Sequence, residues 1–175
     1  MSFGKIYETT WFGNPIRNGF GDIYFDISTD LTSFIFTFTT AADNETKTIP
    51  TTGGGYNYTV TTSDGQLFTN VTGDQAITFP TAGNYDVRIS VANGGTFPRI
   101  FIDNNSEKAS FTNIKQFGNI QWTSFAQSFR GAINLTGTFV DLPDLSSVFS
   151  LNRMFRDASL FNQPLNWNVS NVTNM

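Results

Sequence analysis

The sequence contains neither cysteine nor histidine among its 175 residues. Without cysteine there is no disulfide framework and no thiolate metal site. Without histidine the commonest general base near neutral pH is missing, and with it the usual route to an activated serine. Asp, Glu, Lys and Tyr could still catalyse, but most familiar enzyme constellations are excluded. We therefore expect a protein that is not an enzyme and that uses no cofactor and no metal.

Charged residues are also sparse, at 14% of the chain, and the formal net charge is −4. Nucleic-acid affinity rests on Lys and Arg, so an acidic chain without a basic run is a poor candidate for nucleic-acid binding. No apolar run approaches membrane-spanning length, and no membrane insertion is expected. The plentiful residues are Phe, Thr, Asn, Gly and Ser, which is typical of β-strands joined by many turns.

Residues 1–30 are rich in aromatic residues and glycine. Within them "GNPIRNG" predicts a turn and "GDIYFDIS" a short strand. So short a segment could not bury its rings alone, and it must pack either on the next domain or on another protein. It also lacks the basic start, long apolar middle and cleavage site of a secretory signal, so we do not expect ordinary export if Met1 is the natural start.

Residues 31–103 predict one strand after another. "SFIFTFTT" alternates, with Phe34, Phe36 and Phe38 on one face and Ile35 on the other. Further alternating strands are predicted around Tyr58, Leu67, Ile77 and Tyr85, with turns at Ser63–Gly65 and Pro80–Gly83 and a last strand through Ile100 and Ile102. Short strands at this spacing predict a β-sandwich.

The stretch "YNYTV…SDG…VTGDQAITFPTAGNYDVRISV…FPRIFIDN" resembles the PKD-like, immunoglobulin-type module of bacterial surface proteins. "AGNYDVRISV" is similar to the final strand motif of that family. Of the family's Trp-Gly-Asp-Gly-type turn, this chain keeps only Asp64-Gly65.

Residues 104–175 repeat themselves. Phe125 aligns with Leu151 and Phe129 with Phe155, and further along the unit Leu145 aligns with Val169. A period near 25 is the signature of a leucine-rich-type solenoid. In each unit we expect a short helix, such as "SLNRMFRDA", that buries apolar residues at i, i+3, i+4 and i+7: Leu151, Met154, Phe155 and Ala158.

The last unit ends on Val169, Val172 and Met175 with no polar cap. Because a terminal unit of a solenoid needs a cap, the pattern predicts that the natural chain continues or that a partner covers this end. "LNRMFRDASLFNQPLNWNVSNVTNM" resembles the BspA-type leucine-rich repeat, preceded by a diverged first unit. The resemblance implies adhesion at a surface, through binding to host proteins, glycans or mucus, and it implies no catalytic residues.

The start "GKIYETTWFGNPIRNGFGDIYFD" resembles structural proteins of phages that infect Bacteroidetes. A phage particle also reconciles an adhesive module with the missing signal sequence. We therefore expect a fibre or decoration protein on the virion surface, with the alternative of a BspA-type bacterial cell-surface adhesin fragment. Fibres are commonly homotrimers, but this sequence carries no trimer signature. The residues expected to attach the chain to other virion proteins are Tyr7, Trp11, Phe12, Phe20 and Tyr24.

Four residues in the repeats are candidates for contact with a ligand. Arg130 and Arg156 occupy one repeat position and could form an outward basic ladder for acidic glycans, or else pair with Asp157 or with carbonyls. Trp122 and Trp167 could offer faces to sugar rings, or at least one of them could pack in the core.

Acidic residues allow two further hypotheses. Asp141 and Asp144, or Asp22 and Asp26, could form a carboxylate pair for sugar chemistry, although solvent-facing turn acids are the simpler interpretation. Residues 103–105, Asp-Asn-Asn, could hold Ca²⁺, although a turn that ends a strand is again simpler.

Overall fold

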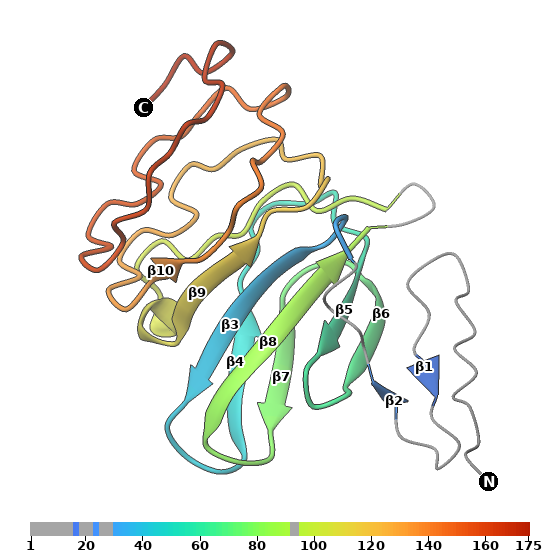
Figure 1. The fold of residues 1–175 in the computed structure, drawn as a ribbon. Coiled ribbons are helices and arrows are strands. Elements are labelled where there is room, and N and C mark those ends of the chain that lie inside the picture. Colours follow the sequence, from blue (N-terminus) through green and yellow to red (C-terminus); the bar gives the residue numbers. More distant parts are fainter. Residues whose placement is uncertain (1–15, 18–22, 25–29, 92–94) are drawn as a thin grey trace, which may run out of the picture. The chain divides into compact units, whose positions relative to one another are not determined.

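The computed structural model describes residues 16–17, 23–24, 30–91 and 95–175 (Figure 1). The chain divides into two compact units, Met1–Asp30 and Leu31–Met175. In the first unit, β1 (Ile16–Arg17) pairs antiparallel with β2 (Ile23–Tyr24). β2 lies in the predicted strand, whereas β1 lies in "GNPIRNG", so the prediction of a turn is wrong at these two positions. Of the predicted attachment residues, Tyr24 is described only as backbone of β2, and the others lie outside the described residues: Tyr7, Trp11, Phe12 and Phe20.

The second unit is mainly β, as predicted. Its larger sheet has the strand order β10-β9-β3-β8-β5-β6, and its smaller sheet pairs β4 with β7. Neighbouring strands are antiparallel except for β9 and β10, which are parallel. The strands are β3 (Phe34–Thr40), β4 (Glu45–Ile49), β5 (Tyr58–Thr62), β6 (Leu67–Val71), β7 (Gln75–Phe79), β8 (Gly83–Ser90), β9 (Phe111–Gln116) and β10 (Thr136–Gly137).

Alternation along β3 builds the core. Phe34, Phe36 and Phe38 are all fully buried. From the smaller sheet, the Phe79 ring stacks on Tyr85 of β8 with centroids 4.3 Å apart, so the two sheets pack on each other. Burying each such ring contributes about 1.5–3 kcal/mol, which makes this aromatic layer a main source of stability.

The predicted strands at β3, β5, β6, β7 and β8 are confirmed, but the last one is wrong. Ile100 and Ile102 are fully buried without belonging to any strand. Their segment makes isolated backbone bonds, such as that from Ile102 N–H to Ser128 C=O at 3.1 Å. β4 and β9 were not predicted, because "ETKTI" and "FTNIKQ" lack a clean alternation of apolar residues.

Beyond β9 the chain forms coils that lie side by side, running from orange to red in Figure 1. A ladder of backbone hydrogen bonds of 2.7–3.0 Å joins equivalent positions of neighbouring coils. Between two neighbouring coils, the N–H groups donate to the carbonyls of the following coil in four bonds: from Phe125, Gln127, Phe129 and Gly131 to Ser150, Asn152, Met154 and Arg156. One coil later, the N–H of Leu151 donates in the same way to the carbonyl of Asn174 at 2.8 Å.

The short helix predicted over residues 150–158 is not formed, and that prediction is wrong. In this repeat the N–H groups that lie between the ladder positions donate to the carbonyl three residues earlier in the chain, as Met154 N–H donates to Leu151 C=O. These bonds form turns. Arg153 and Asp157 have φ values of 56° and 62°, which interrupt any helix. The described residues include one short helix, the 3₁₀ helix η2 (Ser106–Ala109). The side chains that the predicted helix would bury are nevertheless buried or half-buried: Leu151, Met154, Phe155 and Ala158.

The stretches 31–103 and 104–175 share a sheet, because β9 of the second pairs with β3 of the first. They also share one hydrophobic core. The domain boundary predicted after residue 103 therefore stays a prediction from the sequence pattern, because the two stretches pack together without a break in the core. Within the stretches that the structure describes, no helix is long and apolar enough to cross a membrane.

Candidate functional site

β9 carries two β-bulges where it pairs with β3. Thr37 pairs with Asn113 and the following Phe38 with Phe111, which leaves Thr112 as an extra residue. In the same way Lys115 is extra, because Ile35 pairs with Gln116 while Phe36 pairs with Ile114. A bulge inserts one unmatched residue and redirects the side chains beside it.

The burial of β9 follows from these bulges. Phe111, Ile114 and Phe117 are fully buried, at every third position rather than every second. Between them lie the pairs Thr112-Asn113 and Lys115-Gln116, which are half-buried or exposed. β9 thus presents two successive polar side chains on its outer face where a regular strand presents one.

The outer face of the larger sheet holds a groove of about 740 Å³ over β3, β8, β9 and β10. Among the described residues, none with an aromatic ring or an aliphatic side chain lines it. We call it the polar groove, and its lining residues are Thr37, Thr39, Ser63, Asn84, Asp86, Thr112, Asn113, Lys115, Asn134 and Thr136.

A row of hydrogen bonds crosses the polar groove from strand to strand. The Thr39 hydroxyl donates to Asn84 Oδ1 at 2.7 Å and lies 2.9 Å from the Thr112 hydroxyl. On the far side of β9, the Thr136 hydroxyl donates to the Thr112 carbonyl at 2.9 Å. These bonds hold one side chain from each of four strands in fixed positions.

The two charged residues of the polar groove neutralise each other. Lys115 Nζ lies 2.7 Å from Asp86 Oδ2, with the two side chains 40% and 22% exposed. Asp86 Oδ1 also accepts a hydrogen bond of 3.0 Å from the Thr37 hydroxyl. Because both carboxylate oxygens are engaged, the described lining of the groove offers neither a free carboxylate for a cation nor an unpaired cation for an anion.

Several polar atoms of the groove retain hydrogen-bonding capacity. Asn84 accepts through Oδ1, while its Nδ2 group donates to no other described residue. Asn134 Nδ2 donates to the Ala109 carbonyl at 2.9 Å, which leaves Asn134 Oδ1 as an acceptor. Both side chains are exposed. The arrangement can therefore bind groups that both donate and accept hydrogen bonds.

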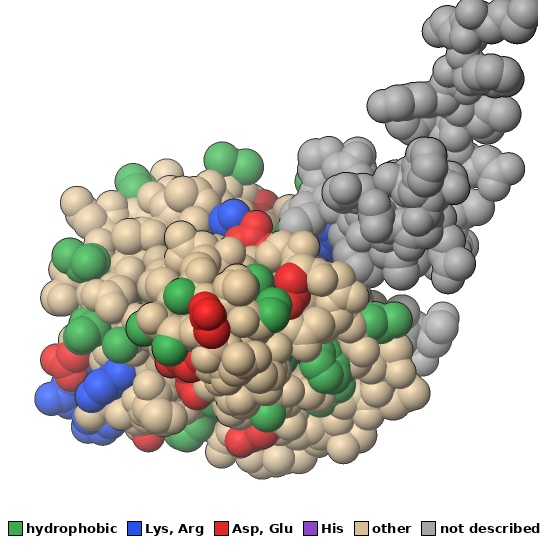
Figure 2. Space-filling view, turned by 90° about the horizontal axis from the view of Figure 1, so that it is seen from below, with side chains coloured by type: hydrophobic (Ala, Val, Ile, Leu, Met, Phe, Trp, Pro, Cys, Tyr) green, Lys and Arg blue, Asp and Glu red, His purple; other side chains and the backbone are tan. Residues whose placement is uncertain are grey.

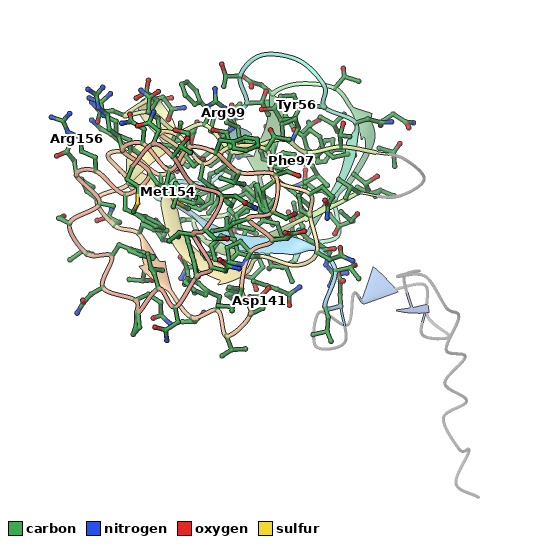
Figure 3. All side chains as sticks on the ribbon, turned by 90° about the horizontal axis from the view of Figure 1, so that it is seen from above. Tyr56, Phe97, Arg99, Asp141, Met154 and Arg156 are labelled. Carbon is green, nitrogen blue, oxygen red and sulfur yellow. The ribbon has the colours of Figure 1, made fainter. Side chains whose placement is uncertain are left out.

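Arg130 and Arg156, the predicted ladder, differ in their surroundings. Arg130 Nη1 bonds to Asp103 Oδ1 at 2.7 Å, and its side chain is 25% exposed. Arg156 lies 3.6 Å from Asp157, is 53% exposed, and stands at the outer edge of the coils in Figure 3. In Figure 2 the visible basic side chains lie beside acidic ones. Of the two, Arg156 alone has a largely available guanidinium, and a ladder for acidic glycans stays a prediction.

The two tryptophans pack inward. Trp122 is fully buried and meets Phe34 edge to face at a centroid distance of 5.1 Å. The prediction that Trp122 offers a face to sugar rings is therefore wrong, because the aromatic core encloses its ring. Trp167 is half-buried against Phe117 at 5.4 Å. The alternative of core packing holds for Trp122, and Trp167 also contacts the core.

Asp141 and Asp144 each serve a turn. Asp141 Oδ2 accepts hydrogen bonds from the backbone N–H groups of Phe117 and Gly118 at 2.9 and 2.7 Å. The backbone N–H of Ser146 donates to Asp144 and lowers the pKa of that carboxyl. These contacts match turn acids rather than a carboxylate pair. Asp22 and Asp26 lie outside the described residues.

The oxygens of residues 103–105 are also engaged. Asp103 Oδ1 accepts from Gln127 Nε2 and from Arg130, both at 2.7 Å. Asn105 Oδ1 accepts from the N–H of Glu107 and caps η2. These contacts favour a turn over a calcium site. Within the described ranges, no group of three or more Asp or Glu side chains is placed to hold a metal ion.

Sequence reasoning missed the polar groove. Its signal is present in "FTNIKQF", where Phe111, Ile114 and Phe117 recur at every third position with polar pairs between them. A spacing of three does not fit the period of two of a regular strand, and two consecutive bulges explain it. The partner strand, β3, lies far earlier in the chain and could not be identified from this signal.

Residues 97–175 match the model of a protein family described as "Mycoplasma protein of unknown function, DUF285". The match covers the coils and β9, which is less than half of the chain. No curated protein and no solved structure matches the chain. The chain is thus similar, over its C-terminal part, to a family whose description assigns no activity.

Proposed function

We propose that this chain is a non-enzymatic adhesion module of a phage particle, a fibre or decoration protein that displays a solenoid of BspA-type leucine-rich repeats. The observation that carries the proposal is the backbone ladder from residues 125–131 to residues 150–156, which joins one repeat to the next. Each unit of a solenoid contacts only its neighbours, and such a ladder supports this organisation.

A stack of this kind suits adhesion. Neighbouring coils joined by backbone bonds lie about 4.8 Å apart, so equivalent side chains form rows along the stack. Rows of equivalent groups allow a repetitive surface ligand to be held at several points, which raises its apparent affinity without new types of contact. Host-surface proteins and glycans are the partners we propose for this region.

The remaining parts of the chain would attach and space this surface. The packing of the smaller sheet on the larger through Phe79 and Tyr85 supports a PKD-like, immunoglobulin-type sandwich as a rigid spacer. Residues 1–30, with Tyr7, Trp11 and Phe12, would bind other virion proteins. A homotrimer, the common state of fibres, stays a prediction.

Deleting residues 1–30 tests the attachment. Because Leu31–Met175 forms a compact unit with its own core, we expect the truncated chain to keep its β-rich circular dichroism and cooperative melting. We also expect it to be lost from purified virions. A matched control replaces Leu67, which is 57% exposed on β6, with Ala and should leave incorporation unchanged. Truncated chain found in virions at the normal level would refute attachment through this segment.

The alternative is a bacterial cell-surface adhesin fragment, which the BspA-type repeat pattern in residues 150–175 favours on its own. Mass spectrometry separates the two. Under the phage proposal the chain occurs in purified virions, whereas under the alternative it occurs in cell-envelope fractions from uninfected cells.

A further inference from the structure

We propose that the polar groove binds a short neutral oligosaccharide. This inference rests on the proposed adhesive function and adds to it the ligand's chemical class and its site. The site lies on the outer face of β3, β8, β9 and β10, and none of the arginine and tryptophan positions predicted from the sequence lines it.

The bulges of β9 create the site. Each bulge gives up regular pairing with β3, at a cost in ladder hydrogen bonds. In exchange, the first bulge puts the Thr112 hydroxyl 2.9 Å from that of Thr39, and the second puts Lys115 within 2.7 Å of Asp86. Without the bulges a regular β9 would direct every second residue into the core. With Phe111 facing the core, Lys115 would then also point inward and would be lost from the groove.

The charge of the groove selects a neutral ligand. Lys115 and Asp86 form an ion pair inside it, and the other lining residues are uncharged. An acidic ligand would meet the Asp86 carboxylate, and a cationic ligand would meet the Lys115 ammonium. Neither class gains a net electrostatic attraction here.

The hydrogen-bonding capacity of the groove favours hydroxyl groups. Asn84 Nδ2 remains as a donor, and Asn134 Oδ1 remains as an acceptor. A sugar hydroxyl both donates and accepts, so one type of ligand group satisfies both. From β8 to β10 the groove crosses three gaps between strands, about 14 Å, which suits a short chain of sugars better than a single ring.

No aromatic ring of the described residues lines the groove, so binding would depend on hydrogen bonds. Hydrogen bonds exchanged with water contribute little net energy each. We therefore expect weak affinity at a single site, on the order of millimolar, and strong retention only where many copies face a repetitive surface.

Nuclear magnetic resonance on the isotopically labelled full chain tests the inference. The probes are three neutral oligosaccharides, maltohexaose, cellohexaose and chitohexaose, and a heparin hexasaccharide as the acidic comparison. We expect at least one neutral probe to shift the signals of Thr39, Asn84, Thr112 and Asn134 in a saturable manner. The inference is overturned if no neutral probe shifts these signals, or if heparin shifts them at lower concentration.

Two variants locate the binding. Asn84→Ala and Asn134→Ala each remove an exposed side chain of the groove, and each should weaken binding of the neutral probe at least about fivefold. The matched control is Asn171→Ala. Asn171 Nδ2 donates to the carbonyl of Ser146 in the preceding coil, as Asn134 Nδ2 donates to Ala109, but Asn171 lies outside the groove. Equal weakening by the control would overturn the assignment.

Failure of this inference differs from failure of the proposed function. If virions or cell envelopes contain the chain and no neutral probe shifts the groove signals, only the groove assignment is wrong. If a neutral probe binds the groove but the chain is in neither fraction, the proposed adhesive function fails.

Discussion

The rings of Phe36 and Phe111 stack with centroids 4.3 Å apart and planes at 13°. Phe36 lies on β3 and Phe111 on β9, and five strands, β4 to β8, lie between β3 and β9 along the chain. This contact joins the stretch that the sequence predicts as a sandwich to the stretch that it predicts as a repeat. The two therefore depend on one aromatic core for their stability.

Replacing Phe111 with Ala should lower the free energy of unfolding by about 3–5 kcal/mol, because the ring is fully buried and leaves a cavity. We expect residues 31–175 to unfold in one transition at a lower denaturant midpoint, followed by fluorescence and circular dichroism. The control Phe149→Ala, at a residue that is 61% exposed, should change stability by about 0.5 kcal/mol or less. Two separate transitions, only one of them shifted, would show that the stretches are independent.

Arg130 and Arg156 occupy one repeat position but should respond differently to replacement by Ala. Arg130 is bonded to Asp103 at 2.7 Å and is three-quarters buried, so Arg130→Ala should cost about 1–2 kcal/mol. Arg156→Ala should cost about 0.5 kcal/mol or less, because its pair with Asp157 is long and exposed. Denaturant titration of the two variants measures the difference. Equal losses would mean that exposure does not decide the strength of these ion pairs.

The backbone ladder predicts a difference in hydrogen exchange between equivalent residues. The N–H groups of Gln127, Phe129 and Gly131 are bonded to the following coil, and we expect slow exchange. At the equivalent positions one coil later, Arg153 and Phe155 have N–H groups with no acceptor among the described residues. These should exchange at least about tenfold faster by mass spectrometry or nuclear magnetic resonance. Similar protection at both sets would contradict this pattern of backbone hydrogen bonds.

Glu107 should make stability fall as pH rises. The residue is 8% exposed, and burial raises the pKa of its carboxyl above the ordinary value, so the folded state favours the protonated form. Nearby Lys47 opposes this shift and Glu45 adds to it. The stabilisation from protonated Glu107 is fully present below the ordinary carboxyl pKa of about 4.3. It is lost as pH rises through the raised pKa.

The variant Glu107→Gln should therefore be more stable than the natural chain at neutral pH and equally stable near pH 4. Glu45→Gln is the control of opposite sign. The hydrogen bond from Lys47 lowers the pKa of Glu45, so Glu45 stabilises the fold at neutral pH and this contribution is lost as pH falls. Thermal melts from about pH 2.5 to about pH 8 measure both, because the contribution of Glu45 is lost only below the ordinary carboxyl pKa. A Glu107→Gln variant that is less stable than the natural chain at neutral pH would contradict a raised pKa of Glu107.

A strand could be predicted from the sequence where its buried face does not depend on which strands lie beside it in the sheet. Phe34, Phe36 and Phe38 bury one face of β3 whichever strands lie beside it, so alternation alone identified this element. The helix over residues 150–158 failed for a related reason. Burial at i, i+3, i+4 and i+7 is also produced by a coil whose N–H groups alternate between its own turns and the next coil. Periodicity reports which side chains are buried, and it does not report the partners of the backbone.

The amino-acid sequence by itself determined the β-rich class, the buried apolar positions and the regular repeat that becomes the spacing between neighbouring coils. These follow from local composition and from self-similarity, which need no knowledge of distant contacts. Only the tertiary structure decided that β9 pairs with β3 on one side and β10 on the other, and that its bulges turn Thr112 and Lys115 into a shared polar groove. That outcome depends on the pairing register between strands that are distant in the sequence. Core packing fixes this register, and the sequence of neither strand alone reveals it.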